Sequence, residues 1–125
     1  MSEPNEQSKI ALVKDMCAVW GATDFTPEMM IPFFADNCIA RLMHKLPFVH
    51  GPAAVAEQTR SLVPLGTERI KVKYLSHYEV GPILVTHRID TFIVPGKPDS
   101  DWEMVGVFFI VDGKIKEWTD YLLTQ

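Results

Sequence analysis

The chain has 125 residues, of which 47% are hydrophobic and 22% charged, a balance typical of one folded globular domain. Its formal net charge of −4 offers no long-range attraction to phosphate backbones, so nucleic-acid binding is not expected. A polar start, no run of about 20 apolar residues and few cysteines favour a cytoplasmic protein without a leader, a membrane span or a disulfide framework. We expect a single domain over residues 1–125, with residues 1–8 flexible.

Three helices are predicted in the first half of the chain. Apolar residues recur at helical spacing over residues 10–20, and Gly21 then ends the helix. Pro27 suits the first position of a second helix, which Pro32 should keep short or kinked because proline lacks the amide of a continuing helix. A third helix is expected over residues 53–63, between two turns that contain proline and glycine.

Alternating polar and apolar residues predict strands over residues 37–46, 70–80, 83–94, 102–111 and 114–123. Both faces of the first strand are mixed, so its inward face stays open. In the second strand, the even-numbered residues from 70 to 80 should share the buried face. The fourth strand is apolar on both faces and is expected to be central. Helices followed by a meander of long strands argue for an α+β fold, with the helices on one side of a curved sheet.

Three charged residues fall on apolar strand faces. Arg88 and Asp90 are two residues apart in one strand, so they point to the same side. Asp120 lies in the last strand, with Trp118 and Leu122 as its neighbours on that face. Such charges are costly to bury unless partners compensate them. They either form a structural ion pair at a wet rim of the sheet or share one apolar hollow as proton donor and proton acceptor.

The remaining reactive residue types show no pattern of a metal or cofactor site. The four histidines lack ligand spacing, and phosphate loops, serine hydrolase elbows and dinucleotide-binding glycines are missing. Cys17 and Cys38 have no neighbouring base in the sequence, so buried, inert thiols are expected. The methionines are expected to be core fillers or walls of a pocket. Neither a metal nor a cofactor is predicted.

Four segments carry the residues of a known family. Residues 86–90 read Thr-His-Arg-Ile-Asp, residues 106–108 Gly-Val-Phe, residues 112–115 Asp-Gly-Lys-Ile and residues 118–121 Trp-Thr-Asp-Tyr. In type and spacing they resemble the limonene-1,2-epoxide hydrolase family, and the likeness covers residues 35–123. That family belongs to the group with the cone-like fold of nuclear transport factor 2 and the polyketide cyclases. The resemblance implies helices wrapped inside a strongly curved mixed or antiparallel sheet.

The resemblance also implies an activity. In the family, a water activated by the later Asp attacks the epoxide carbon, the earlier Asp protonates the epoxide oxygen, and the Arg bridges the two. Carried over by motif, Asp120 is the general base, Asp90 the general acid and Arg88 the bridge. This chemistry suits epoxide opening, which needs a proton on oxygen as the opposite face is attacked. A small apolar substrate is expected to contact Phe92, Trp118, Met43 and Tyr74.

The first strand departs from the family pattern. The family positions its water with a Tyr and an Asn two residues apart, whereas this chain has either Ala40 and Leu42 or Arg41 and Met43 at those places, depending on the register. Two alternatives therefore stay open beside the hydrolase. One is an isomerase or cyclase that moves a proton on a carbonyl substrate, and the other is a non-catalytic module that binds a small ligand. Substitutes for the missing pair, if they face the cavity, are His44, Tyr74 and Tyr78.

The outer face of the meander is expected to be largely apolar. A domain with few helices cannot cover both faces of its sheet, so a homodimer formed through this face is expected. The residues alternating there are His87, Thr91, Glu117 and Tyr121 with Val85, Ile89, Ile93, Val105, Val107 and Phe109.

Overall fold

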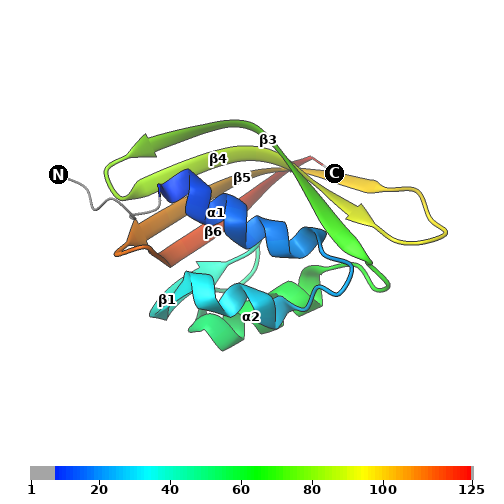
Figure 1. The fold of residues 1–125 in the computed structure, drawn as a ribbon, viewed down its shortest axis with the longest axis horizontal. Coiled ribbons are helices and arrows are strands. Elements are labelled where there is room, and N and C mark those ends of the chain that lie inside the picture. The colour runs from blue at the N-terminus through cyan, green and yellow to red at the C-terminus, as the bar shows by residue number, and fades with distance from the viewer. Residues whose placement is uncertain (1–7, 125) are drawn as a thin grey trace.

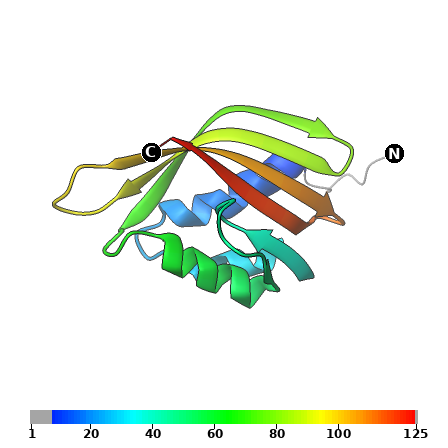
Figure 2. The ribbon, with the colours of Figure 1, turned by 180° about the vertical axis from the view of Figure 1, so that it is seen from behind.

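The structure is a computed structural model that describes residues 8–124, and its helices lie on one side of a curved sheet (Figure 1). Figure 2 shows α1 and α2 on the same side of the long strands when the molecule is seen from behind. The predicted α+β fold is confirmed. Residues 1–7, most of the segment expected to be flexible, lie outside the described residues. The elements are α1 (Lys9–Ala18), η1 (Val19–Gly21), η2 (Pro27–Phe33), β1 (Phe34–Arg41), β2 (Val49–His50), α2 (Pro52–Leu62), β3 (Arg69–Val80), β4 (Ile83–Ile93), β5 (Ser100–Val111) and β6 (Lys114–Thr124).

The helices follow from the sequence signals that predicted them. Ser8 caps α1, because its hydroxyl accepts a hydrogen bond of 3.2 Å from the backbone N–H of Ala11. The last turn of the predicted first helix tightens into η1, a 3-10 helix that ends at Gly21. The short second helix is entirely 3-10, with Pro27 at its start and Pro32 inside it. None of the helices in residues 8–124 is long and apolar enough to cross a bilayer.

The core lies between the helices and the inner face of the sheet. It combines the apolar side of α1 with the inner residues of β1, β5 and β6. Cys17 and Cys38 are buried free thiols within it, as predicted. Burial raises the pKa of Cys17 to about 12, so this thiol stays protonated near neutral pH.

The first strand ends earlier than predicted. β1 stops at Arg41 instead of residue 46, because the backbone N–H of Leu42 donates to Oε1 of Gln58 in α2, at 2.6 Å, and the chain turns. β1 pairs parallel to β6 and antiparallel to the short β2. The sequence did not determine which face of this strand is buried. In the structure, Cys38 and Ala40 lie on the buried face at this end.

β3 changes faces halfway along its length. Tyr74 pairs with Arg88 on the inner face, but Ser76 pairs with His87 on the outer face, so one extra residue forms a bulge between them. The prediction that the even-numbered residues from 70 to 80 share the buried face is therefore wrong for the second half of the strand. Tyr78 points outward and is 64% exposed.

The last four strands form the predicted antiparallel meander. The strand order is β2-β1-β6-β5-β4-β3, which confirms β5 as an interior strand. Asp112 and Gly113 make the final hairpin turn with φ of 53° and 73°, the left-handed conformation that a two-residue hairpin of this type requires. In the resulting register, Gly106 of β5 stands opposite Thr86 of β4 on one side and Asp120 of β6 on the other.

Candidate active site

Two charged residues of the site come from β4. Buried residues alternate with half-buried ones along this strand, which points Arg88 and Asp90 to the inner face. The Arg88 side chain is 0% exposed and that of Asp90 7%. Nε and Nη2 of Arg88 donate to the two carboxylate oxygens of Asp90, at 2.9 and 3.0 Å. This is a buried bidentate ion pair and not one at a wet rim of the sheet.

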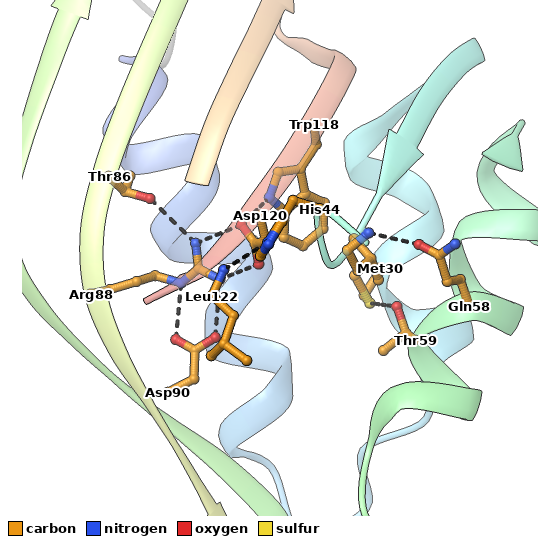
Figure 3. A network of polar contacts seen from close by, with 11 residues as sticks. Met30, His44, Gln58, Thr59, Thr86, Arg88, Asp90, Trp118, Asp120 and Leu122 are labelled. Carbon is orange, nitrogen blue, oxygen red and sulfur yellow. Dashed lines mark hydrogen bonds and ion pairs between the residues drawn. The ribbon is translucent and has the colours of Figure 1, made fainter. Parts of the chain in front are cut away.

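Arg88 also reaches the second carboxylate, Asp120 on β6 (Figure 3). Nη1 donates to Oδ1 of Asp120 at 3.1 Å, and Nη2 donates to Oδ2 at 2.5 Å. A further bond of 3.3 Å runs from Nη1 to the hydroxyl of Thr86. These bonds use all five N–H groups that a guanidinium carries. Arg88 is therefore a fixed bridge between the two carboxylates and has no N–H left for a ligand.

Gly106 provides the space in which this bridge forms. β5 lies between β4 and β6, so the Arg88 side chain must cross it to meet Asp120. A Cβ on Gly106 would lie 2.6 Å from Nη1 of Arg88 and 2.7 Å from Oδ1 of Asp120, closer than real Cβ atoms approach other atoms. A side chain at this position is therefore incompatible with the ion pair as it stands.

Trp118 fixes the orientation of the second carboxylate. Its Nε1 donates to Oδ1 of Asp120 at 2.6 Å. The indole ring is held in a stack of aromatic rings, with centroid distances of 5.0 Å to Phe108, 6.0 Å to Phe34 and 6.1 Å to Trp20. Oδ1 of Asp120 accepts from both Trp118 and Arg88, so Oδ2 is the oxygen with more capacity to accept a further proton or hydrogen bond.

Burial and charge act on the cluster in opposite directions. Burial raises the pKa of Asp120 above its ordinary value, and the charge and hydrogen bonds of Arg88 oppose this rise. Burial alone would lower the pKa of Arg88, but Asp120 and Asp90 together raise it well above its ordinary value. The guanidinium is therefore permanently charged, and the two carboxylates hold it in common. Such a cluster can hold a proton on one carboxylate while the other accepts one.

The two carboxylates line one cavity with a volume of about 50 Å³. Phe92 and Trp118, both expected to contact a substrate, also line it. The rest of the wall is mostly apolar, and the ring of Phe92 packs against that of Trp102 with centroids 4.7 Å apart. Arg88, Asp90 and Asp120 thus converge beside a largely apolar hollow, where electrostatic interactions are stronger than in bulk water.

The inner face of β1 carries one of the two residue pairs considered for the missing water-positioning pair. Ala40 is fully buried and pairs with Trp118, while Arg41 pairs with Thr119 on the other face. Leu42 lines the cavity beside Asp120. Of the two pairs, Ala40 and Leu42 therefore lie on the inner side of the sheet.

The other predicted site residues lie away from this cavity. Met43 lines a groove at the end of β6, and Tyr74 lies under α1, so neither of these two predicted substrate contacts lines the cavity beside Asp120. Tyr74 lies on the inner face of β3, but α1 covers that part of the sheet. The hydroxyl of Tyr74 is buried next to the Cys17 thiol. His44 accepts a hydrogen bond from the backbone N–H of Leu122 through Nδ1, at 3.3 Å (Figure 3). His44 and Tyr78 therefore do not replace the missing pair.

Several residues of the site were not predicted from the sequence, among them two in the cavity wall and one glycine. Thr59 of α2 and Trp20 of η1 line the cavity, and Gly106 lies beneath the ion pairs. Trp20 belongs to the apolar stripe of the first helix, which indicated only a core residue. The glycine in the Gly-Val-Phe segment was a visible signal, but its role depends on the pairing of three strands.

Comparisons with known proteins bear on the family and on the fold. The sequence matches the family described as the limonene-1,2-epoxide hydrolase catalytic domain over residues 9–125. No curated protein matches the chain. An LEH-like epoxide hydrolase from M. tuberculosis has a similar structure, with a TM-score of 0.70, 21% identity and coverage of 90% of this chain and 80% of that one. A SnoaL-like polyketide cyclase from Jannaschia sp. CCS1 gives a TM-score of 0.72 at 18% identity, with 98% and 90% covered. A protein from Catenulispora acidiphila with a ketosteroid isomerase-like fold, in complex with trimethylamine, gives 0.71 at 17%, with 96% and 86% covered.

Proposed function

This chain belongs to the limonene-1,2-epoxide hydrolase family, and from that premise we propose that it adds water to a small, mostly apolar epoxide. Oδ2 of Asp120 takes a proton from a water molecule as the water oxygen attacks one epoxide carbon. The bond from that carbon to the epoxide oxygen breaks, and Asp90 gives its proton to the departing oxygen. The product is a vicinal diol, and a proton moves back from Asp120 to Asp90 before the next turnover.

One observation carries this proposal: Arg88 joins two carboxylates at the wall of a single apolar cavity. The shared guanidinium holds both carboxylates in place without moving during the reaction, which is how preorganised sites lower a barrier. Burial, together with the excess of two carboxylates over one cation, favours one proton for the pair. Those are the requirements of simultaneous proton donation and proton removal.

The experiment is to incubate the protein with small alicyclic and linear epoxides in ¹⁸O-labelled water. We expect a diol that carries one ¹⁸O atom, identified by mass spectrometry. The cavity of about 50 Å³ is much smaller than the roughly 300–1,000 Å³ of ordinary ligand pockets, so the smallest cyclic epoxides should be the best substrates. Failure of every epoxide in the panel to give labelled diol would remove the hydrolase proposal.

A proton-transfer reaction on a carbonyl compound is the second candidate, and Leu42 favours it. With Ala40 and Leu42 on the inner side of the sheet, a nucleophilic water has fewer groups to align it. A buried carboxylate with a raised pKa can still exchange the proton next to a carbonyl. Exchange of deuterium into a small cyclic ketone, without any diol from the epoxides, would select this reaction.

We also propose that the protein is a homodimer joined through the outer face of the sheet. The described helices lie on the inner face (Figures 1 and 2), so Val85, Val107 and their apolar neighbours remain half-buried at most. The bulge in β3 adds Tyr78 and Val80, which are 64% and 72% exposed. A monomer would leave this apolar surface in water.

Light scattering after gel filtration should therefore give twice the mass of the chain for the unmodified protein. Val107→Arg places a charge between Val85 and Thr119, in the middle of this face, and should give a folded monomer. Leu65→Arg is the matched control, because Leu65 is 98% exposed on a loop away from the sheet, and it should remain dimeric. A monomeric unmodified protein at micromolar concentration contradicts the proposal.

A further inference from the structure

The cavity beside the two carboxylates meets solvent at one end. Most of the residues that line it are buried, and the partly exposed ones are Leu62 and Val63, at the end of α2, and Trp102 of β5. A molecule that enters from solvent therefore passes between the end of α2 and Trp102. We call this end of the cavity, bounded by these three residues, the mouth.

The proton donor lies near the mouth, and the base lies farther in. Asp90 pairs with Trp102, and residues directly opposite each other on one face of a sheet have neighbouring side chains. Asp120 pairs with Gly106, which is four positions, or about 13 Å, farther along β5. Beyond Asp120 lies Trp118, which is 1% exposed and belongs to the buried aromatic stack (Figure 3). The cavity thus runs from the mouth past Asp90 to a closed end at Asp120.

This order of the two carboxylates fixes the direction of attack. Ring opening needs the attacking water and the epoxide oxygen on opposite sides of the attacked carbon. Because Asp90 protonates the oxygen and Asp120 activates the water, the oxygen faces the mouth and the water lies at the closed end. The attacked carbon lies between them. The second ring carbon is displaced toward the oxygen, so this carbon and its substituents lie nearer the mouth.

The closed end leaves little room around the attacked carbon. Leu42 directly follows β1, in the register in which Ala40 pairs with Trp118, so it stands next to Asp120. Its side chain is buried, and its backbone N–H is held by Gln58 at 2.6 Å. Substituents on the attacked carbon project sideways from the line of attack, against the wall that Leu42 and Trp118 form. A hindered carbon is therefore excluded from this position.

We infer that the site orients an unsymmetrical epoxide with its less substituted carbon toward Asp120, and that Leu42 enforces this orientation. The inference rests on the proposed hydration and adds its regiochemistry. The water oxygen bonds to the less substituted carbon while the bond from that carbon to the epoxide oxygen breaks. Asp120 takes a proton from the water, and Asp90 gives one to the departing oxygen. Suitable substrates thus have at least one unhindered ring carbon, and the bulk of the molecule lies toward the mouth.

The test uses 1,2-epoxy-2-methylpropane, which has one CH₂ ring carbon and one ring carbon with two methyl groups. Acid-assisted opening in solution puts the incoming oxygen mainly on the dimethyl carbon, so the reactivity of the molecule itself opposes the expected result. The full-length protein is incubated with it in ¹⁸O-labelled water, and dilute acid without protein gives the reference. Fragmentation of the diol between its two carbons locates the label by mass spectrometry. We expect at least about tenfold more label on the CH₂ carbon, a discrimination that one small group can cause in a tight pocket.

Leu42→Ala tests the residue that enforces the orientation. The truncation frees space at the closed end, so the ratio of the two labelled diols should shift severalfold toward the dimethyl carbon. Leu62→Ala is the matched control, because it removes the same atoms at the mouth. It should leave the ratio of the two labelled diols unchanged. If Leu42→Ala does not fold, the smaller truncation Leu42→Val is used for the same comparison.

The outcomes separate this inference from the hydrolase proposal. Diol labelled mainly on the dimethyl carbon by the unmodified protein overturns the orientation and leaves the hydrolase in place. An unchanged ratio in the Leu42 variant, or an equal shift in Leu62→Ala, overturns the role of Leu42. Absence of labelled diol from this and every other epoxide removes the hydrolase and the orientation together.

Discussion

Asp120→Asn and Asp90→Asn should each lower kcat/KM for epoxide hydration by about 10²- to 10⁴-fold, the usual contribution of a general base or a general acid. Asparagine keeps the size of the side chain, but it can neither remove a proton from water nor protonate the epoxide oxygen. Turnover in ¹⁸O water measures the loss. The matched control is Asp99→Asn, a substitution of the same type at an exposed turn residue, which should keep the unmodified rate. If Asp120→Asn or Asp90→Asn retained a tenth or more of the rate, that result would contradict the role of the residue as general base or general acid.

The acid side of the pH dependence of the unmodified protein follows from Asp120. As the pH falls, Asp120 becomes protonated and can no longer act as a base, and burial moves this fall in rate above the pH expected of an ordinary aspartate. The acidic limb of the kcat/KM profile should therefore be displaced upward in pH.

Stability should respond in the opposite direction from activity. Because folding raises the pKa of Asp120, the folded state binds that proton more tightly than the unfolded chain, and stability falls as the pH rises from the ordinary value through the raised one. Asp120→Asn removes this cost and leaves Arg88 paired with Asp90, so no buried charge is stranded. Urea unfolding at pH 7 should show that the free energy of unfolding of the variant is no more than about 1 kcal/mol below that of the unmodified protein.

Gly106→Ala should be nearly as damaging to activity, although Gly106 touches no substrate. The added methyl group would stand within 3 Å of both Arg88 and Asp120, so one of these side chains must move. Once they part, Asp120 loses its bridge to Asp90, and kcat/KM should fall by at least about a hundredfold. Overpacking of this kind also costs about 1–3 kcal/mol of folding free energy, measurable by thermal unfolding.

Gly21→Ala is the control for Gly106→Ala. It shows whether any glycine-to-alanine change has the same effect or only the one beneath the ion pairs. A Cβ on Gly21 would meet only the backbone oxygen of Ile70 at 3.8 Å, an ordinary contact. This variant should keep both the rate and the stability of the unmodified protein. If Gly106→Ala retained full activity, the crossing of Arg88 over β5 would not be needed for catalysis.

The sequence was sufficient to predict the features that depend on short-range periodicity. The two-residue period of a strand was enough to put Arg88 and Asp90 on the same inner face. The motif then added Asp120, on a strand that the meander brings close to them. Features that depend on distant contacts could not be predicted. β1 ends where it does because Gln58, 16 positions away, takes the backbone N–H of Leu42. The bulge after Tyr74 has no sequence signature, yet it reverses the faces of half a strand.

The placement of side chains around the cavity was also beyond the sequence. Tyr74 was expected at the substrate because it faces inward, but only the packing of α1 shows that a helix covers it. Trp20 sits on a helical stripe that is the same whether its indole N–H is paired or not. Both cases depend on how a helix lies against the sheet, which the period of a single element does not determine.

The crossing of Arg88 over β5 also bears on how the strands find their partners during folding. If β5 paired one residue out of alignment, its two faces would be exchanged, and Val105 or Val107 would stand where Gly106 now stands. The guanidinium would meet a branched side chain and could not reach Asp120. The buried Asp120 carboxylate would then lack its cation, and breaking a buried pair in this way costs about 3–5 kcal/mol. Misaligned hairpins are therefore poor competitors of the native one. The three charged residues therefore also favour a single alignment of the strands.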